Sequence, residues 1–199
     1  MGPAPRHPYV RRAGTGRLPG GWRLTWTVAD GHRGRRWRAI TVAGDRLLHT
    51  LLLEVAPDGT LSKLDVAAPE GLLTLHPEPD ASMLHGNIVR ADGIEHVTLP
   101  WSRAHILMLG TSPVTAAVAV VSLAVRIGVG EGASVPVIQV GESLAICRAT
   151  WRTARTGERR WRLLAADGGP SLTLELDADG VPTGLDDAAD WPLDRAPAR

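Results

Sequence analysis

Turn signals divide this sequence into short segments at intervals of 8 to 15 residues. Each join carries Gly, Pro or an Asp-Gly pair, residue types that bend the chain or accept a positive φ. Between the joins, apolar and polar residues alternate with the two-residue period of a half-buried strand, as in Trp22–Val28. About a dozen such segments, without any long helical period, predict an all-β fold.

The short joins also favour antiparallel pairing of consecutive strands. Trp22–Val28 and Arg36–Val42 predict one hairpin, and Leu47–Val55 with Leu61–Val66 predict a second around Pro57–Gly59. Parallel strands would need crossover helices, which no segment clearly indicates. We therefore expect a single strongly curved antiparallel sheet of about a dozen strands, or a barrel or half-barrel built from them.

The longest apolar run, Val114–Val129, can be interpreted in three ways. It is too short for a membrane span, which needs about 20 apolar residues, and it contains Arg126. Its Ala residues suit a helix, but its many β-branched side chains lose rotamer freedom against a helical turn. Large and small residues alternate with one slip of phase near Val121. This pattern favours two strand segments joined by a bulge, whose large side chains face inward.

With 199 residues and a mass of 21.2 kDa, the chain has the size of one domain. We expect a flexible basic arm over residues 1–20, an antiparallel β domain over 21–185 and a C-terminal tail over 186–199. No transmembrane segment is expected, and the N-terminus has no apolar signal core. The single Cys147 cannot form an internal disulfide, so a cytoplasmic location is the default expectation.

Positive charge and tryptophan are unevenly distributed. Residues 1–46 hold ten Arg against two Asp, whereas the whole chain has a net charge of only +1. Trp22, Trp26, Trp37, Trp151 and Trp161 lie among Arg residues. One hypothesis is an interaction module that binds an anionic polymer or an acidic protein through Arg and Trp. The simpler interpretation is that Trp fills large core positions, because the chain has no Phe. Binding to nucleic acid is not expected.

The motifs of common enzyme sites are missing. The phosphate-binding patterns GxxxxGK[ST] and GxGxxG do not occur, nor does the GxSxG nucleophile elbow. His76, His85, His96 and His105 are spaced by 9, 11 and 9 residues and could converge on a metal, but no close acidic ligand accompanies them. We therefore predict no catalytic residue, no metal and no cofactor. An enzyme that uses these histidines is a third hypothesis, in which replacing His96 or His105 abolishes activity.

Four short segments match a known family: Asp92-Gly93, Thr111–Thr115, Val135–Val140 followed by Leu144, and Leu174–Val181. Through them the chain, from about Leu48 to Leu185, resembles the glycolipid-binding family, which is similar in fold to half-barrel lipoprotein carriers. The family's Asp-x-Asp before the Ser-Pro step is replaced by His105–Leu109. The resemblance therefore implies an apolar cavity more strongly than polar headgroup contacts at that position.

The leading hypothesis is a non-enzymatic binding protein that holds a lipid or glycolipid-like hydrophobic ligand on the concave face of its curved sheet. Burial of an acyl chain contributes about 0.8 kcal/mol per CH₂, so such a cavity needs no catalytic group. Trp101, His105, Met108 and Trp151 are the residues expected to line it. The sequence does not specify an oligomeric state.

Overall fold

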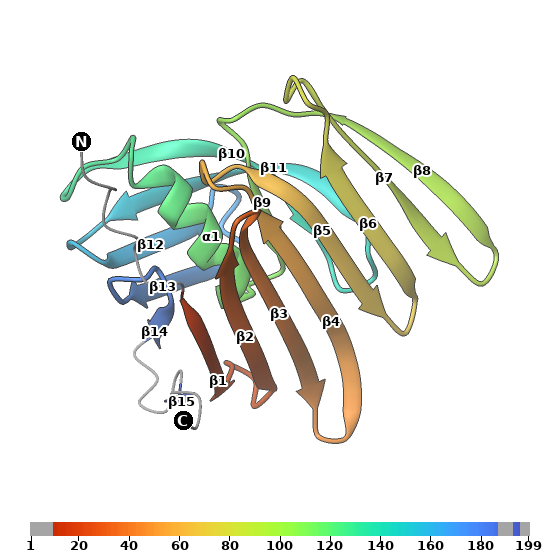
Figure 1. Cartoon of the computed structure of the whole chain (residues 1–199), viewed down its shortest axis with the longest axis horizontal. Helices are drawn as coiled ribbons and strands as arrows, with labels where there is room; N and C mark the ends of the chain where they lie inside the picture. The colour runs from red at the N-terminus through yellow and green to blue at the C-terminus, as the bar shows by residue number, and fades with distance from the viewer. Residues whose placement is uncertain (1–9, 187–192, 196–199) are drawn as a thin grey trace.

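The computed structural model describes residues 10–186 and 193–195, which form two β-sheets and one α-helix (Figure 1). The larger sheet has the strand order β15-β1-β2-β3-β4-β5-β6-β7-β8. Its strands are β1 (Arg11–Arg17), β2 (Arg23–Gly31), β3 (Gly34–Ala43), β4 (Arg46–Val55), β5 (Leu61–Ala68), β6 (Gly71–Pro77), β7 (Met83–Arg90), β8 (Gly93–Pro100) and β15 (Leu193–Arg195). The smaller sheet has the order β14-β13-β12-β11-β10-β9. Its strands are β9 (Ile106–Leu109), β10 (Gly132–Val140), β11 (Ile146–Arg155), β12 (Arg160–Ala165), β13 (Ser171–Leu176) and β14 (Pro182–Leu185).

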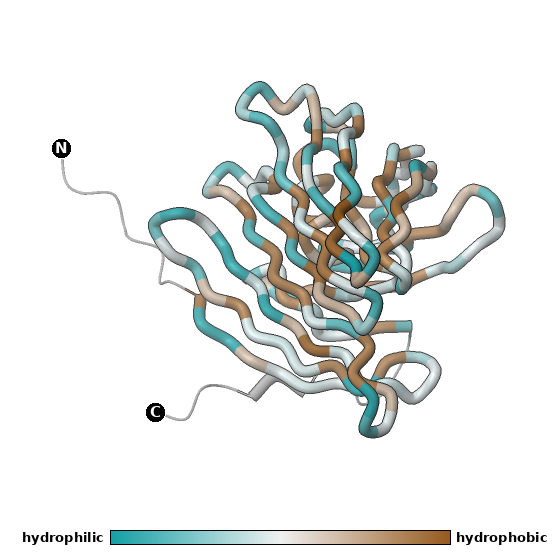
Figure 2. The backbone as a smooth tube through the Cα atoms, turned by 90° about the vertical axis from the view of Figure 1, so that its right-hand side faces the viewer, coloured by the Kyte–Doolittle hydropathy of each residue, from teal (hydrophilic) through white to brown (hydrophobic). Residues whose placement is uncertain are grey.

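The nine-stranded sheet is antiparallel throughout, and both predicted hairpins are confirmed as β2–β3 and β4–β5. Hydrophobic and hydrophilic residues alternate along its strands, which is visible along the tube of Figure 2. In β2 every second side chain, from Leu24 to Val28, is buried. The buried Trp26 and Trp37 lie on neighbouring strands with ring centroids 5.8 Å apart. One face of the sheet therefore contributes to the hydrophobic core, as the alternation predicts.

The expectation of a single sheet is wrong, because the strands divide into two sheets. The six-stranded sheet curls into a half-barrel, so the coarser expectation of an all-β, half-barrel architecture is confirmed. The break falls between β8 and β9, which are not paired with each other. Trp151 and Trp161 are buried on the smaller sheet as Trp26 and Trp37 are on the larger one.

The prediction of strands in the Ala/Val-rich run is also wrong, because Pro113–Leu123 forms helix α1. β9 and β10 pair in parallel, and a parallel pair needs a crossover connection between its strands. Pro113 stands at the start of the helix, where its fixed φ is already helical and its missing N–H is not needed. Most of the helix is buried, and α1 contacts β9, β13 and β14. Burial around most of its surface outweighs the weak helix propensity of Val.

Both ends of the described chain join the larger sheet. The arm expected to be flexible over residues 1–20 contains β1, which pairs with β2 along all seven of its residues. In the expected tail, β15 pairs with β1 through Leu193 to Arg195. The remainder of each predicted segment, residues 1–9, 187–192 and 196–199, lies outside the described residues. Within the described part of the chain, no helix has the length and hydrophobicity needed to cross a membrane.

Candidate functional site

Two clefts lie on either side of the β4–β5 turn, where the nine-stranded sheet approaches α1. One, here called the apolar cleft, has a volume of about 740 Å³. The other, here called the charged cleft, has a volume of about 790 Å³. Ala56, Pro57 and Gly59 of the turn and Val121 of α1 line both clefts. The two spaces are therefore neighbours that share one wall.

The apolar cleft is lined by strands β4 and β5 with the turn between them, by the loops that follow β6 and β8, by the start of β9, and by one side of α1 and the turn after it. Its volume falls in the range of small-molecule binding sites. Its apolar lining residues are Leu53, Ala56, Pro57, Leu61, Pro77, Pro79, Ala81, Trp101, Ile106, Leu107, Val118, Ala119, Val121 and Val125. The charged side chains that line it are Asp58, Glu78, Arg103 and Arg126.

Trp101 and His105 form an aromatic pair in the wall of the apolar cleft. Their ring centroids lie 5.5 Å apart with an interplanar angle of 27°. The Trp101 backbone N–H donates to the Ser82 carbonyl oxygen at 3.0 Å, which ties the loop after β8 to the loop after β6. Nδ1 of His105 is 2.9 Å from the Ser102 hydroxyl oxygen. His105 Nε2 has no hydrogen-bond partner among residues 10–186 and 193–195, so it can bind a polar atom of a ligand.

The loop between β6 and β7 is held by its own hydrogen bonds. The Glu78 backbone N–H donates to the Met83 carbonyl, and Glu78 Oε1 lies 2.8 Å from Nε2 of His85. The Ser82 N–H donates to Asp80 Oδ1 at 2.9 Å, which lowers the pKa of that carboxyl group, and the Ser82 hydroxyl donates to Glu78 Oε2 at 3.2 Å. Ala81 adopts a φ of 57°, which this network holds in place. The loop thus presents Pro77, Pro79 and Ala81 to the cleft in a fixed arrangement.

The β4–β5 turn that separates the clefts is closed by a compact set of hydrogen bonds. The Ala56 N–H donates to the Thr60 carbonyl oxygen at 2.8 Å, and Gly59 has a φ of 84°, which favours glycine. The Thr60 hydroxyl donates to Asp58 at 2.6 Å and holds the pKa of Asp58 below its ordinary value. Arg103 lies 3.4 Å from the same carboxylate, across the mouth of the apolar cleft.

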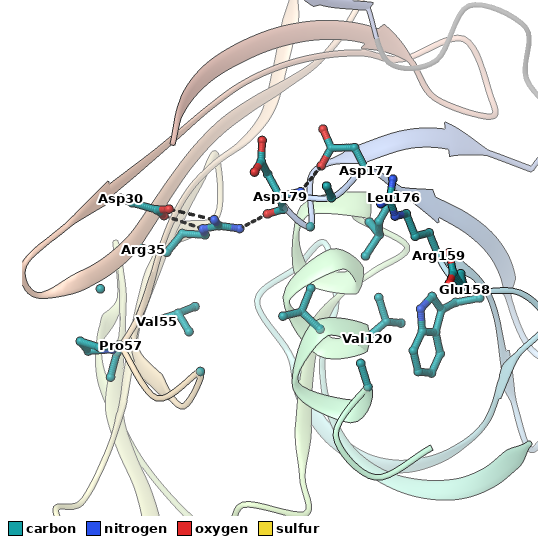
Figure 3. A pocket seen from close by; sticks show the side chains of 18 of the residues that line it. Asp30, Arg35, Val55, Pro57, Val120, Glu158, Arg159, Leu176, Asp177 and Asp179 are labelled. Atoms are coloured by element: carbon teal, nitrogen blue, oxygen red, sulfur yellow. Dashed lines mark hydrogen bonds and ion pairs between the residues drawn. The ribbon is translucent and has the colours of Figure 1, made fainter. Parts of the chain in front are cut away.

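In the charged cleft, ionic contacts join the two sheets (Figure 3). Arg35 of β3 contacts both carboxylate oxygens of Asp30, at 2.6 and 2.9 Å, and also donates to the carbonyl oxygen of Asp179 in the β13–β14 turn. Arg12 of β1 makes an ion pair with Asp177 in the same turn. Arg35, Asp177 and Asp179 therefore take part in contacts that join the two sheets.

The structure brings together two of the four residues predicted to line a ligand site. Trp101, which is 9% exposed, and His105 line the apolar cleft. Met108 is 0% exposed and Trp151 is 1% exposed, and neither lines either cleft. Both are core residues, because β9 is buried on both faces and Trp151 lies on the inner face of β11. A role in ligand binding for Trp101 and His105 stays a prediction.

Sequence reasoning missed the helical wall of the apolar cleft. Val118, Ala119, Val121 and Ser122 line it from α1, in the segment predicted to be strands. The signal that could have found them is the Ser112-Pro113 step, since Pro is favoured in the first turn of helices.

The predicted histidine cluster does not form a compact site. His76 and His85 are opposite each other on β6 and β7, and His96 lies on β8, whereas His105 lies in the apolar cleft. His85 contacts Glu78 and Thr98, while His96 contacts Asn87. Among the described residues, no three His, Cys, Asp or Glu side chains are arranged to hold a metal ion.

The Arg/Trp pattern divides between the two faces of the strands. Trp26, Trp37, Trp151 and Trp161 are buried, while the Arg residues next to the last three of these in sequence are exposed on the other face of their strands. Arg155, which lies over the Trp161 ring at 5.5 Å from its centroid, is the cation–π contact found within the described residues. Core packing explains why these Trp residues are buried. The hypothesis of an interaction module that binds its partner through Trp therefore loses its support.

No protein-family model matches the chain, and no curated protein gives a significant match. The fold is similar to the crystal structure of a DUF1089 family protein from Pseudomonas aeruginosa, with a TM-score of 0.53 and 15% sequence identity. The match covers 92% of this chain and 93% of that chain. The two chains share a fold. The likeness reaches no further than architecture, so membership of a glycolipid-binding family stays a prediction.

Proposed function

We propose that the protein is a non-enzymatic binding protein for a lipid or glycolipid-like molecule, whose acyl chain occupies the apolar cleft. The supporting observation is an open space of about 740 Å³ with fourteen apolar lining residues, among them Trp101, beside four charged ones. Ligand sites commonly combine a mainly apolar lining with a few polar groups that fix orientation. An acyl chain with a polar head matches both features.

The position of the proposed site differs from the sequence-based expectation. Helix α1 packs against β9, β13 and β14 on the concave side of the smaller sheet (Figure 1), and the ligand was expected on the concave face of a curved sheet. The space left for a ligand lies on the other side of the helix, against the β4–β5 turn and the loops after β6 and β8. We keep the hypothesis of a hydrophobic ligand. Helix α1 and loops, as well as strands, form the walls of the proposed site.

The polar groups give the ligand an orientation. Arg103 and Arg126 stand at the rim, and His105 Nε2 is free to donate to or accept from a ligand oxygen. A hydroxyl, phosphate or carboxylate head can bind there while the chain lies between Leu53 and Val118. No covalent chemistry is required of these groups, which is consistent with binding rather than catalysis.

The test is a variant that fills the cleft. Val118 is half-buried in its wall, so Val118→Trp places an indole where the acyl chain would lie. Native mass spectrometry of protein purified from its own host should show a retained lipid in the wild type and none in Val118→Trp. Leu72→Trp is the matched control, because Leu72 is 43% exposed on the nine-stranded sheet and lines neither cleft. An apo mass in the wild type, together with unchanged Trp fluorescence on adding acyl glycolipids, would refute the proposal.

A further inference from the structure

Two exposed apolar side chains stand at the C-terminal end of α1. Val121 is 43% exposed and Val125, in the turn after the helix, is 87% exposed. They are four positions apart, which places them next to each other along a helical turn. Both line the apolar cleft, and Val121 also lines the charged cleft. Single exposed apolar residues are common, but this pair forms an apolar lip that continues into an apolar cleft.

The lip is flanked by arginines that have no ion pair within the part of the chain that the structure describes. Arg126 lines the apolar cleft and Arg159 the charged cleft, and neither has an ion pair among the described residues. Arg155 donates to the carbonyl oxygens of Glu158 and Ile127 instead of to a carboxylate.

The carboxylates that line the two clefts are largely paired within the protein. Asp58 faces Arg103, Glu78 contacts His85, Asp30 is bound by Arg35, and Asp177 and Asp179 contact Arg12. Among the described lining residues, Glu158 is the carboxylate that has no ion pair. Beyond the lining residues, Glu131 in the turn after the lip accepts from the Gly128 N–H and has no ion pair within the described chain. Three guanidinium groups therefore stand against two carboxylates around the lip, which leaves a local surplus of one positive charge.

We propose that this end of the molecule docks on the surface of an anionic lipid membrane. Val121 and Val125 insert at the boundary between headgroups and acyl chains, and Arg126 and Arg159 contact lipid phosphates. Amphipathic membrane-binding surfaces combine these two elements: apolar side chains at shallow depth and basic side chains beside them. In this orientation the apolar cleft opens toward the bilayer. If the proposed lipid-binding function holds, an acyl chain can pass between membrane and cleft with little exposure to water.

The test is flotation of the full chain with vesicles of phosphatidylcholine alone or mixed equally with phosphatidylglycerol. The wild type should bind the anionic vesicles roughly tenfold more strongly than the neutral ones, because each basic side chain near the surface contributes to attraction. Salt should weaken this binding. Val125→Asp should lower the partition coefficient about tenfold, since it removes an inserted apolar group and adds a repelled charge. Arg159→Glu should lower it by a similar factor.

Matched controls carry the same chemical changes away from the lip. Ile94 is 63% exposed on β8, and Arg46 is exposed at the other end of β4 from the β4–β5 turn. Ile94→Asp and Arg46→Glu should float with the vesicles as the wild type does. Equal losses in these controls, or no flotation of the wild type with anionic vesicles, would overturn the docking surface.

The Val118→Trp variant separates this proposal from the proposed function. It should lose its bound lipid but keep vesicle binding, because the lip and its cations are unchanged. A wild type that retains a lipid but does not bind vesicles refutes docking alone. A wild type that binds vesicles but retains no lipid refutes the proposed function alone.

Discussion

The affinity of the apolar cleft for single-chain fatty acids should rise with chain length and then level off. Each CH₂ buried contributes about 0.8 kcal/mol, which is roughly a fourfold decrease in Kd, so two added carbons should tighten binding about fifteenfold. The gain ends when the chain reaches the end of the cleft, whose volume is about 740 Å³. Further carbons then stay in water and contribute little.

The assay is isothermal titration calorimetry with acids of eight to sixteen carbons, below their micelle concentrations. Burial of apolar surface should give a negative heat-capacity change that grows with chain length up to the plateau. Because the acyl chain contributes only apolar contacts, the gain in binding free energy per CH₂ should be almost independent of salt. Binding to an anionic polymer would weaken with salt.

The Val118→Trp variant tests whether the chain lies where we propose. Its indole shortens the space between α1 and the β4–β5 turn, so the affinity should level off at a shorter acyl chain. The Leu72→Trp control should keep the wild-type plateau. An affinity that does not depend on chain length, or a plateau that Val118→Trp leaves unchanged, would refute the assignment of the cleft.

Three further predictions concern stability, measured by urea unfolding. A Cβ on Gly86 would lie 1.8 Å from a backbone oxygen of β6, so Gly86→Ala should lower the free energy of unfolding by at least about 3 kcal/mol. The control is Gly141→Ala, whose Cβ would have no neighbour nearer than 3.6 Å and which should change that free energy by less than about 1 kcal/mol. Burial lowers the pKa of His49, so the unfolded chain binds the proton more readily; stability should fall as pH drops below about 6.5, and His49→Gln should reduce that dependence. Arg35→Gln should cost about 1–2 kcal/mol, because it removes a two-oxygen contact with a half-buried Asp30.

Much of the strand pattern could be predicted because it depends on neighbours in sequence. Alternation in Trp22–Val28 identifies β2, and the Pro57–Gly59 turn identifies the β4–β5 hairpin. The absence of Phe correctly directed Trp26 and Trp37 to the core. These inferences succeed because side-chain alternation and turn chemistry act within a few residues.

The candidate site was predicted only in part, because its walls come from distant segments. Trp101 and His105 were identified as large side chains beside an apolar strand, and they do line the cleft. Met108 shares that sequence context but is enclosed by the parallel β9–β10 pair. Nothing local distinguishes the two cases, because exposure to a cleft depends on which element lies opposite.

The sequence by itself determined that the chain is rich in strands, where most of its hairpins turn and which strand faces are apolar. Only the tertiary structure decided that the strands form two sheets, and that β9 and β10 are parallel. That parallel pair requires a crossover, so the Ala/Val-rich segment becomes helix α1 although its β-branched residues favour strands. The physical reason is that burial of the helix between distant segments contributes more free energy than local propensity, and the clefts exist where that burial is incomplete.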